Sequence, residues 1–255
     1  MPNHITNIIE LECSGERSME IMEFLKAEGQ DYGSVDFNKL IPMPESLDIT
    51  SGSETDRGIE IYLTAVNPHT KDFGYEKMNP VEFDSLVSKL NTERMFSKYN
   101  TSLSDNEIQT LTKDEPFEKY ADIGKIATDN MIQYNATTWY EWRIANWGTK
   151  WNAYDCYVDD PHDGRLEFNT AWSGVPVIIQ KISEKFPDVL IHYGWADEDI
   201  GSNTGRIDFK NGEEVWFDIP ESGSKHAFEI ACDIQGYDIE EFEECFKESS
   251  DRDSR

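Results

Sequence analysis

The chain has 255 residues, of which 38% are apolar and 12% aromatic, and its 51 acidic and 23 basic side chains give a formal net charge of −28. These apolar side chains suffice to bury a core, which excludes general disorder. The charge excludes nonspecific attraction to nucleic acid or anionic lipid, because phosphate binding requires a basic surface. No apolar run approaches the ~20 residues that span a bilayer, and no signal peptide opens the sequence, so we expect a cytoplasmic protein.

The first 44 residues carry a strand, helix, strand pattern. Residues 6–13 alternate apolar and polar, which predicts a β-strand, and residues 16–28 carry apolar side chains at helical spacing. Residues 35–40 alternate again and are followed by two prolines. We therefore expect residues 1–44 to form a βαβ unit, the first part of a larger domain.

Residues 45–146 are expected to form a mainly helical insert. Within it, residues 59–65 alone resemble a short strand, and a helix is predicted after Pro80. Ser104 and Glu107 form a capping-box pattern that opens another helix. Over residues 120–145 apolar side chains recur every three or four positions, which predicts one long helix whose stripe packs in the core.

Residues 147–255 return to short alternating segments separated by turn signals. The predicted elements are a hairpin of residues 153–158 and 165–172, a helix over 175–186, a strand over 189–195, a second hairpin of 206–209 and 215–219, and helices over 225–235 and 239–247. Ser173 is the expected N-cap of the first of these helices, and Asn211-Gly212 the expected turn of the second hairpin.

This order of elements predicts an α+β fold: a ferredoxin-like split βαβ antiparallel sheet with helices on one face, a mainly helical insert, and an extra C-terminal hairpin and helices. The first and last parts, residues 1–44 and 147–255, would form the ferredoxin-like domain. The term names a topology only, because four scattered cysteines do not suit an iron–sulfur cluster.

Six sequence blocks support a family resemblance. They are MPNHITN at residues 1–7, WGTKWNAYD at 147–155, FNTAWS at 168–173, VPVII at 175–179, ISEKFPD at 182–188 and DEDIG at 197–201. Through them the chain resembles the YubB-type ferredoxin-like family carried by phages and conjugative plasmids. The resemblance covers the first seven residues and about residues 147–205. It implies a fold and a mobile-element origin, and no reaction, because the family has no established one.

No catalytic motif accompanies these blocks. The five histidines include no pair at i, i+4, and the sequence contains no P-loop, no G-x-G-x-x-G and no G-x-S-x-G. We therefore expect a non-catalytic protein with no catalytic residues, no cofactor and no bound metal.

The block at 147–155 has two interpretations. Trp147, Lys150, Trp151, Asn152 and Asp155 could line a ligand pocket in which Lys150 stacks on an indole ring. Alternatively, the two tryptophans anchor the insert on the sheet, as buried aromatic side chains usually do.

The acidic residues supply the candidates for partner binding. They are Asp159, Asp160, Asp163, Asp197, Glu198, Asp199, Glu240, Glu241, Glu244 and Glu248. One hypothesis is that these carboxylates replace phosphates in the groove of a basic host protein, such as a nuclease or an immunity complex, with no direct contact to nucleic acid or membrane. A second is a small-ligand or divalent-metal module that uses residues 147–155 and the acidic loop 197–199. A solvated surface that only maintains solubility, and a structural role, stay open as well.

Overall fold

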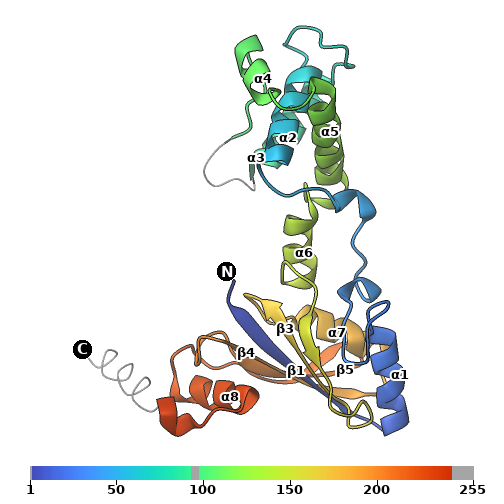
Figure 1. Cartoon of the computed structure of the whole chain (residues 1–255), viewed down its shortest axis with the longest axis vertical. Helices are drawn as coiled ribbons and strands as arrows, with labels where there is room; N and C mark the ends of the chain where they lie inside the picture. The colour runs from blue at the N-terminus through green and yellow to red at the C-terminus, as the bar shows by residue number, and fades with distance from the viewer. Residues whose placement is uncertain (1, 93–97, 243–255) are drawn as a thin grey trace, which may run out of the picture. The chain divides into compact units, whose positions relative to one another are not determined.

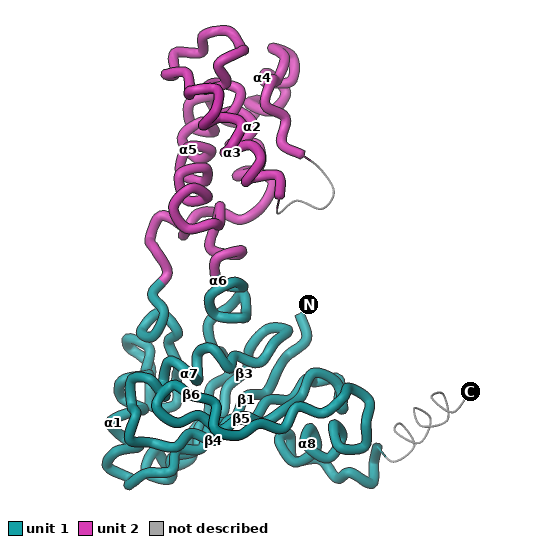
Figure 2. The backbone as a smooth tube through the Cα atoms, turned by 180° about the vertical axis from the view of Figure 1, so that it is seen from behind, with its two compact units in different colours: residues 1–42, 143–255 teal, residues 43–142 magenta. Residues whose placement is uncertain are grey.

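The computed structural model describes residues 2–92 and 98–242. The chain divides into two compact units: unit 1 comprises residues 1–42 and 143–255, and unit 2 comprises residues 43–142 (Figure 2). Within the described part of the chain, no helix combines the length and the apolar character that crossing a membrane requires.

Unit 1 is built on a six-stranded antiparallel sheet with the strand order β2-β3-β1-β4-β5-β6 (Figure 1). The strands are β1 (His4–Glu12), β2 (Tyr154–Tyr157), β3 (Arg165–Ala171), β4 (Leu190–Asp197), β5 (Gly205–Lys210) and β6 (Glu213–Asp218). Helix α1 (Gly15–Leu25) follows β1, and α7 (Pro176–Lys185) connects β3 to β4. This is the β-α-β-β-α-β order of a ferredoxin-like sheet, which confirms the predicted fold class. The hairpin of β5 and β6 extends the sheet beyond β4.

One face of the sheet holds a buried polar network under α7. Asn7, which is fully buried, accepts a hydrogen bond from the Tyr193 hydroxyl (2.7 Å) and donates to the Thr170 hydroxyl (2.9 Å). The Tyr193 oxygen in turn accepts from the backbone N–H of Val175, the N-cap of α7 (2.7 Å). Burial raises the pKa of Tyr193, so the hydroxyl keeps its proton and the network stays intact. It fixes α7 to the two central strands.

The opposite face is covered in part by α8 (Lys225–Gln235). Ile230, Ala231 and Ile234 of this helix pack on Ile8 and Ala196, whose side chains point away from α7 because strand residues alternate between faces. The prediction that the helices share one face is therefore wrong for α8. The sheet leaves part of this second face open beside the helix.

Residues 35–40 do not form the predicted strand. They contain a short 3₁₀ helix, η1 (Phe37–Lys39), because the Asp36 carboxylate accepts from the backbone N–H of Asn38 (3.0 Å) and caps the turn. The alternating pattern came from burial of Val35 and Phe37. A further 3₁₀ turn, η2, spans Glu45–Leu47. The second strand of the ferredoxin-like order is β2, which follows the insert.

The predicted cap of α7 is also wrong. Val175 precedes the helix and makes no side-chain cap, while Pro176 occupies the first turn. Proline suits this position because its fixed φ matches the helix and its missing N–H would have no partner within the first turn. The carbonyl of Ser173 instead accepts from the Thr170 hydroxyl (2.6 Å).

Unit 2 contains α-helices with a core of their own. They are α2 (Ser53–Val66), α3 (Pro80–Thr92), α4 (Asp105–Leu111), α5 (Phe117–Tyr134) and the first turn of α6 (Trp139–Trp147). The capping box of α4 is present as predicted. Residues 59–65 are helical, not a strand: Ile59, Ile61, Leu63 and Ala65 are all fully buried. A helix buried on every side loses the 3.6-residue periodicity that identifies an amphipathic helix.

The long helix predicted over residues 120–145 is two helices. Asn135 ends α5 in the left-handed conformation (φ 58°), and its N–H bonds to the carbonyl of Met131. Asparagine tolerates this conformation better than other non-glycine residues. Glu141 then accepts from the Thr138 N–H (3.1 Å) and hydroxyl (2.8 Å), which starts α6. The predicted core stripe holds at Tyr120, Ala127 and Met131 of α5, and Trp142 is also buried.

Helices α2 and α5 approach most closely at two glycines. A Cβ on Gly124 would collide with the carbonyl oxygen of Gly58 and lie 2.8 Å from the Cβ of Tyr62. The two backbones are therefore in direct contact, which a side chain at either position would prevent.

Candidate functional site

The acidic candidates fall into two groups at opposite ends of the sheet. Asp159, Asp160 and Asp163 lie in the turn between β2 and β3, where the carbonyl of Gly164 accepts from the N–H of Leu11. Asp197 pairs instead with Ile5, at the other end of β1. Six residues of an extended strand separate these points, a distance of roughly 20 Å. A single contact patch does not include both groups.

The acidic loop after β4 is organised by Asp197. This residue is only 5% exposed, and its carboxylate accepts from the side chain of Asn3 (3.0 Å) and from the backbone N–H of Asp199 (2.9 Å). It therefore holds the loop together from inside, and Glu198 and Asp199 are the carboxylates that the loop exposes.

The end of α8 brings further carboxylates to this loop. Gln235 donates to the carbonyl of Asp197 (2.7 Å), and η3 (Ile239–Phe242), which holds Glu240 and Glu241, follows a few residues later. We call the exposed set the α8-end acidic surface. It consists of Glu198, Asp199, Asp238, Glu240 and Glu241. The sequence analysis did not select Asp238. The candidates Glu244 and Glu248 lie outside the described residues.

Like many other carboxylates in the described part of this acidic chain, the members of this surface have no cationic partner. Among the ion pairs formed within residues 2–92 and 98–242, none includes a member of the α8-end acidic surface. In the β2–β3 turn, by contrast, Asp160 accepts from the backbone and ring of His162, and these hydrogen bonds lower the pKa of its carboxyl group. The α8-end acidic surface therefore keeps its charge available for a partner.

Half of the 147–155 block is structural. Trp147 is fully buried, donates from Nε1 to the carbonyl of Ile41 (2.9 Å) and meets the ring of Phe37 edge to face. Asn152 accepts from the Phe37 N–H (2.9 Å) and donates to the Asp36 carboxylate (2.9 Å). Both residues hold η1 in place.

The other half of the block is exposed. The Lys150 ammonium lies 4.1 Å from the ring centroid of Trp151 and 4.0 Å from that of Trp172, so it fills the space between two indoles. The indoles are 38% and 45% exposed, respectively. Trp172 has a φ of 68° and Asp155 a φ of 48°, conformations that cost free energy in non-glycine residues. The sequence does not single out Trp172 as a site residue, because it stands in a predicted strand, 21 positions after Trp151.

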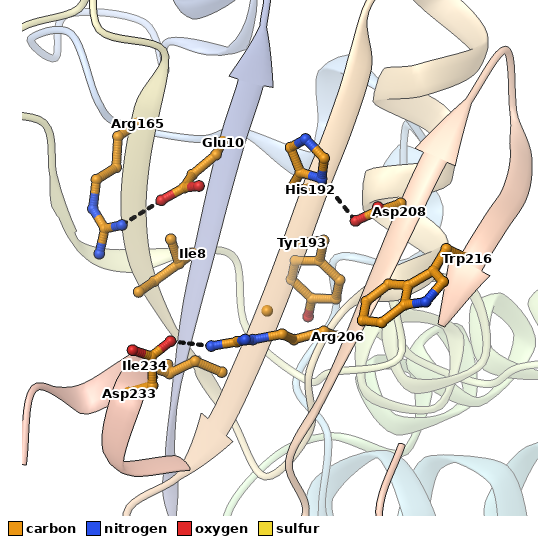
Figure 3. A pocket seen from close by; sticks show the side chains of 11 residues that line it. Ile8, Glu10, Arg165, His192, Tyr193, Arg206, Asp208, Trp216, Asp233 and Ile234 are labelled. Atoms are coloured by element: carbon orange, nitrogen blue, oxygen red, sulfur yellow. Dashed lines mark hydrogen bonds and ion pairs between the residues drawn. The ribbon is translucent and has the colours of Figure 1, made fainter. Parts of the chain in front are cut away.

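The open part of the second sheet face contains a cavity of about 510 Å³ (Figure 3). Its polar lining holds two ion pairs, Arg165 with Glu10 (2.5 Å) and Arg206 with Asp233, and a hydrogen bond between His192 and Asp208 (2.9 Å). Such a volume fits a small ligand. Sequence reasoning missed the cavity, although its residues occupy the polar positions of alternating strands. Among the described residues, no cluster of His, Cys, Asp or Glu is arranged to hold a metal ion.

The contact between His226 and Asp218, at the end of β6, can be tested by titration. His226 Nε2 contacts the Asp218 carboxylate (2.8 Å), and this hydrogen bond raises the pKa of His226 above 6.5. Protonated His226 therefore stabilises the fold below that pH, and this contribution is lost as the pH rises through the folded pKa. We expect Asp218→Asn to lower the pKa of His226 in an NMR titration. An unchanged pKa of His226 would show that the two side chains do not interact.

Comparison with known proteins supports the fold class. Residues 150–247 match the family model described as the ferredoxin-like domain in Api92-like protein. This stretch is thus similar to a ferredoxin-like family, and the match supports that part of the predicted resemblance but not its YubB-type phage or plasmid part.

A solved structure, that of protein api92 from Yersinia pseudotuberculosis, aligns with a TM-score of 0.39 and 10% identity over 87% of this chain and 99% of that chain. No curated protein matches the sequence.

Proposed function

We propose that this chain is a non-catalytic binding protein of a phage or mobile element, which acts in the host cytoplasm by presenting carboxylates to a basic host protein. The partner would be a nuclease, an immunity complex or another nucleic-acid-processing protein, and binding would block its groove. The proposal rests on one observation, the α8-end acidic surface, whose carboxylates take part in no ion pair among the described residues of a chain with a net charge of −28.

The physical argument is electrostatic. A groove that binds duplex phosphates attracts any dense array of negative charge, and carboxylates accept the same hydrogen bonds from Arg and Lys as phosphate oxygens do. The net charge of the chain accelerates association with such a groove, and added salt weakens the attraction. The resemblance to a family of phages and plasmids makes a counter-defence role reasonable.

The test compares two charge variants of the full chain. The first neutralises the α8-end acidic surface through Glu198→Gln, Asp199→Asn, Glu240→Gln and Glu241→Gln. The control neutralises four exposed carboxylates of unit 2 through Glu76→Gln, Glu82→Gln, Asp84→Asn and Glu118→Gln. Both variants carry the same net charge, so a difference between them reports on position.

The immobilised chain is expected to retain basic, nucleic-acid-binding proteins from host lysate and to release them to duplex DNA or to raised salt. Purified partner should bind the first variant at least about tenfold more weakly than the control variant. Equal binding of both variants would favour the solubility interpretation, and recovery of no basic protein would contradict the proposal.

The alternative is a small-ligand or divalent-metal module that uses residues 147–155 and the loop 197–199. The exposed stack of Lys150 between Trp151 and Trp172 favours it. A rise of several degrees in melting temperature with a nucleotide or a divalent ion would support this alternative through linkage.

A further inference from the structure

Strand β6 forms one edge of the sheet in unit 1, since the strand order ends with it. It is hydrogen-bonded to β5 on one side, so its other side presents backbone N–H and C=O groups that a further strand can pair with. Edges of this kind are used for recognition when an extended segment of a partner adds to the sheet.

Exposed apolar side chains lie along the second half of this edge, next to the acidic residues Glu213, Glu214 and Asp218. Val215, Trp216, Phe217 and Ile219 are 55%, 48%, 65% and 56% exposed, respectively. Phe217 pairs with Ile207 and Trp216 with Asp208, so the two rings lie on opposite faces of the strand. A segment that adds here would bury apolar surface on both of its faces.

The other edge of the sheet differs. Strand β2 has only four residues, its register with β3 is irregular, and Asp155 within it has a positive φ. A short, distorted strand is a common protection against edge pairing. Strand β6 does have a register shift beside Val215, yet the residues after it pair regularly with β5. The more regular edge is therefore also the more apolar one.

The acidic residues at both ends of this apolar run favour a basic segment as the binding partner of the edge. Glu213 and Glu214 precede the apolar run, Glu221 follows it, and none of the three belongs to an ion pair formed within the described residues. Lys and Arg opposite these positions would be attracted, whereas acidic residues would be repelled. A second copy of this chain brings another 28 negative charges, and this repulsion opposes self-pairing.

We propose that β6 binds an extended segment of the partner protein in which basic and apolar residues alternate, and that this segment pairs with β6 as a seventh strand. The inference rests on the proposed function and names the part of the partner that the chain recognises. The α8-end acidic surface would then attract the partner, and β6 would hold it.

The experiment uses the full chain and a fluorescent nine-residue peptide of alternating Lys and Val. A second peptide has the same sequence with its backbone nitrogens methylated, which keeps the charge and removes the hydrogen-bond donors. The chain is compared with the variant Phe217→Ser/Ile219→Ser and with a control, Val81→Ser/Ile132→Ser, which removes two apolar side chains of unit 2 that are at least as exposed.

We expect the Lys–Val peptide to bind, and the β6 variant to bind it about tenfold more weakly than the control variant. The methylated peptide should bind the unaltered chain no more tightly than the unmethylated peptide binds the β6 variant. Amide exchange of residues 215–219 should slow when the unmethylated peptide is present. The exchange measurement on the unaltered chain decides the question even if the variant misfolds.

Equal binding of both peptides, or unchanged exchange in β6, would overturn the inference. If, in the same series, the α8-end charge variant no longer binds the partner recovered from lysate, the proposed function stands. Only the strand addition at β6 would then be wrong. If sedimentation shows a dimer that Phe217→Ser/Ile219→Ser dissociates, a second copy occupies the edge and the inference is wrong.

Discussion

Replacing Gly124 by alanine is expected to destabilise unit 2 by about 3 kcal/mol or more. In an ordinary helix this change stabilises by roughly 0.5–1 kcal/mol, because alanine loses less backbone entropy than glycine on folding. Here the new Cβ would collide with the backbone of Gly58, and the Tyr62 Cβ would be 2.8 Å away. Backbone atoms cannot rotate aside, so α2 and α5 would have to separate along their contact.

Urea denaturation followed by circular dichroism measures this effect. The matched control is Gln133→Ala, an exposed position on the same helix, which should change stability by less than about 0.5 kcal/mol. If Gly124→Ala were as stable as the control or more stable, the close approach of the two helices would be disproved.

Tyr193→Phe is expected to destabilise unit 1 by about 1–3 kcal/mol. The substitution removes one oxygen and leaves the ring in place, so packing changes little. It deprives two buried groups of their partner, the Asn7 side-chain oxygen and the Val175 N–H. An unsatisfied buried polar group carries its full desolvation penalty, which exceeds the net gain of an ordinary hydrogen bond.

Tyr157→Phe provides the control for this prediction. Tyr157 is 60% exposed, and its hydroxyl forms a long hydrogen bond to Asp159, at 3.5 Å. Thermal unfolding should therefore separate the two variants clearly, and equal melting temperatures would contradict the network around Asn7. Exchange of the Val175 amide should also accelerate in Tyr193→Phe alone.

The sequence predicts the fold well where pattern and burial agree. Strand β3, most of β1 and the first half of β4 alternate between more and less buried residues, so their pattern is visible in the sequence. The turn at Asn211-Gly212 adopts the two positive φ angles that its residues favour. Prediction from the sequence fails for two segments, one that is buried on most sides and one whose pattern comes from a short capped turn. Residues 59–65 lie in a helix buried all round, and residues 35–40 owe their alternation to a capped turn.

For the candidate site, the sequence predicts the type of residue but not which residues lie together. The sequence shows that carboxylates are abundant, but their grouping depends on which strand ends lie together, and that is set by sheet order. Asp197 resembles its exposed neighbours in the sequence, yet it is turned inward by Asn3, a residue 194 positions away. Sheet order also decides the exposure of the β6 side chains. The sequence does not show this, because an edge strand and a central strand can have the same pattern of apolar residues.

The placement of unit 2 inside the ferredoxin-like order has a consequence for synthesis. Strand β1 is made early, but its neighbour β3 ends at Ala171, after all of unit 2. At about 5–20 residues per second, a ribosome needs roughly 8 to 30 s to cover that interval. During this time β1 has two unpaired edges and an apolar face, and both features favour aggregation of the nascent chain.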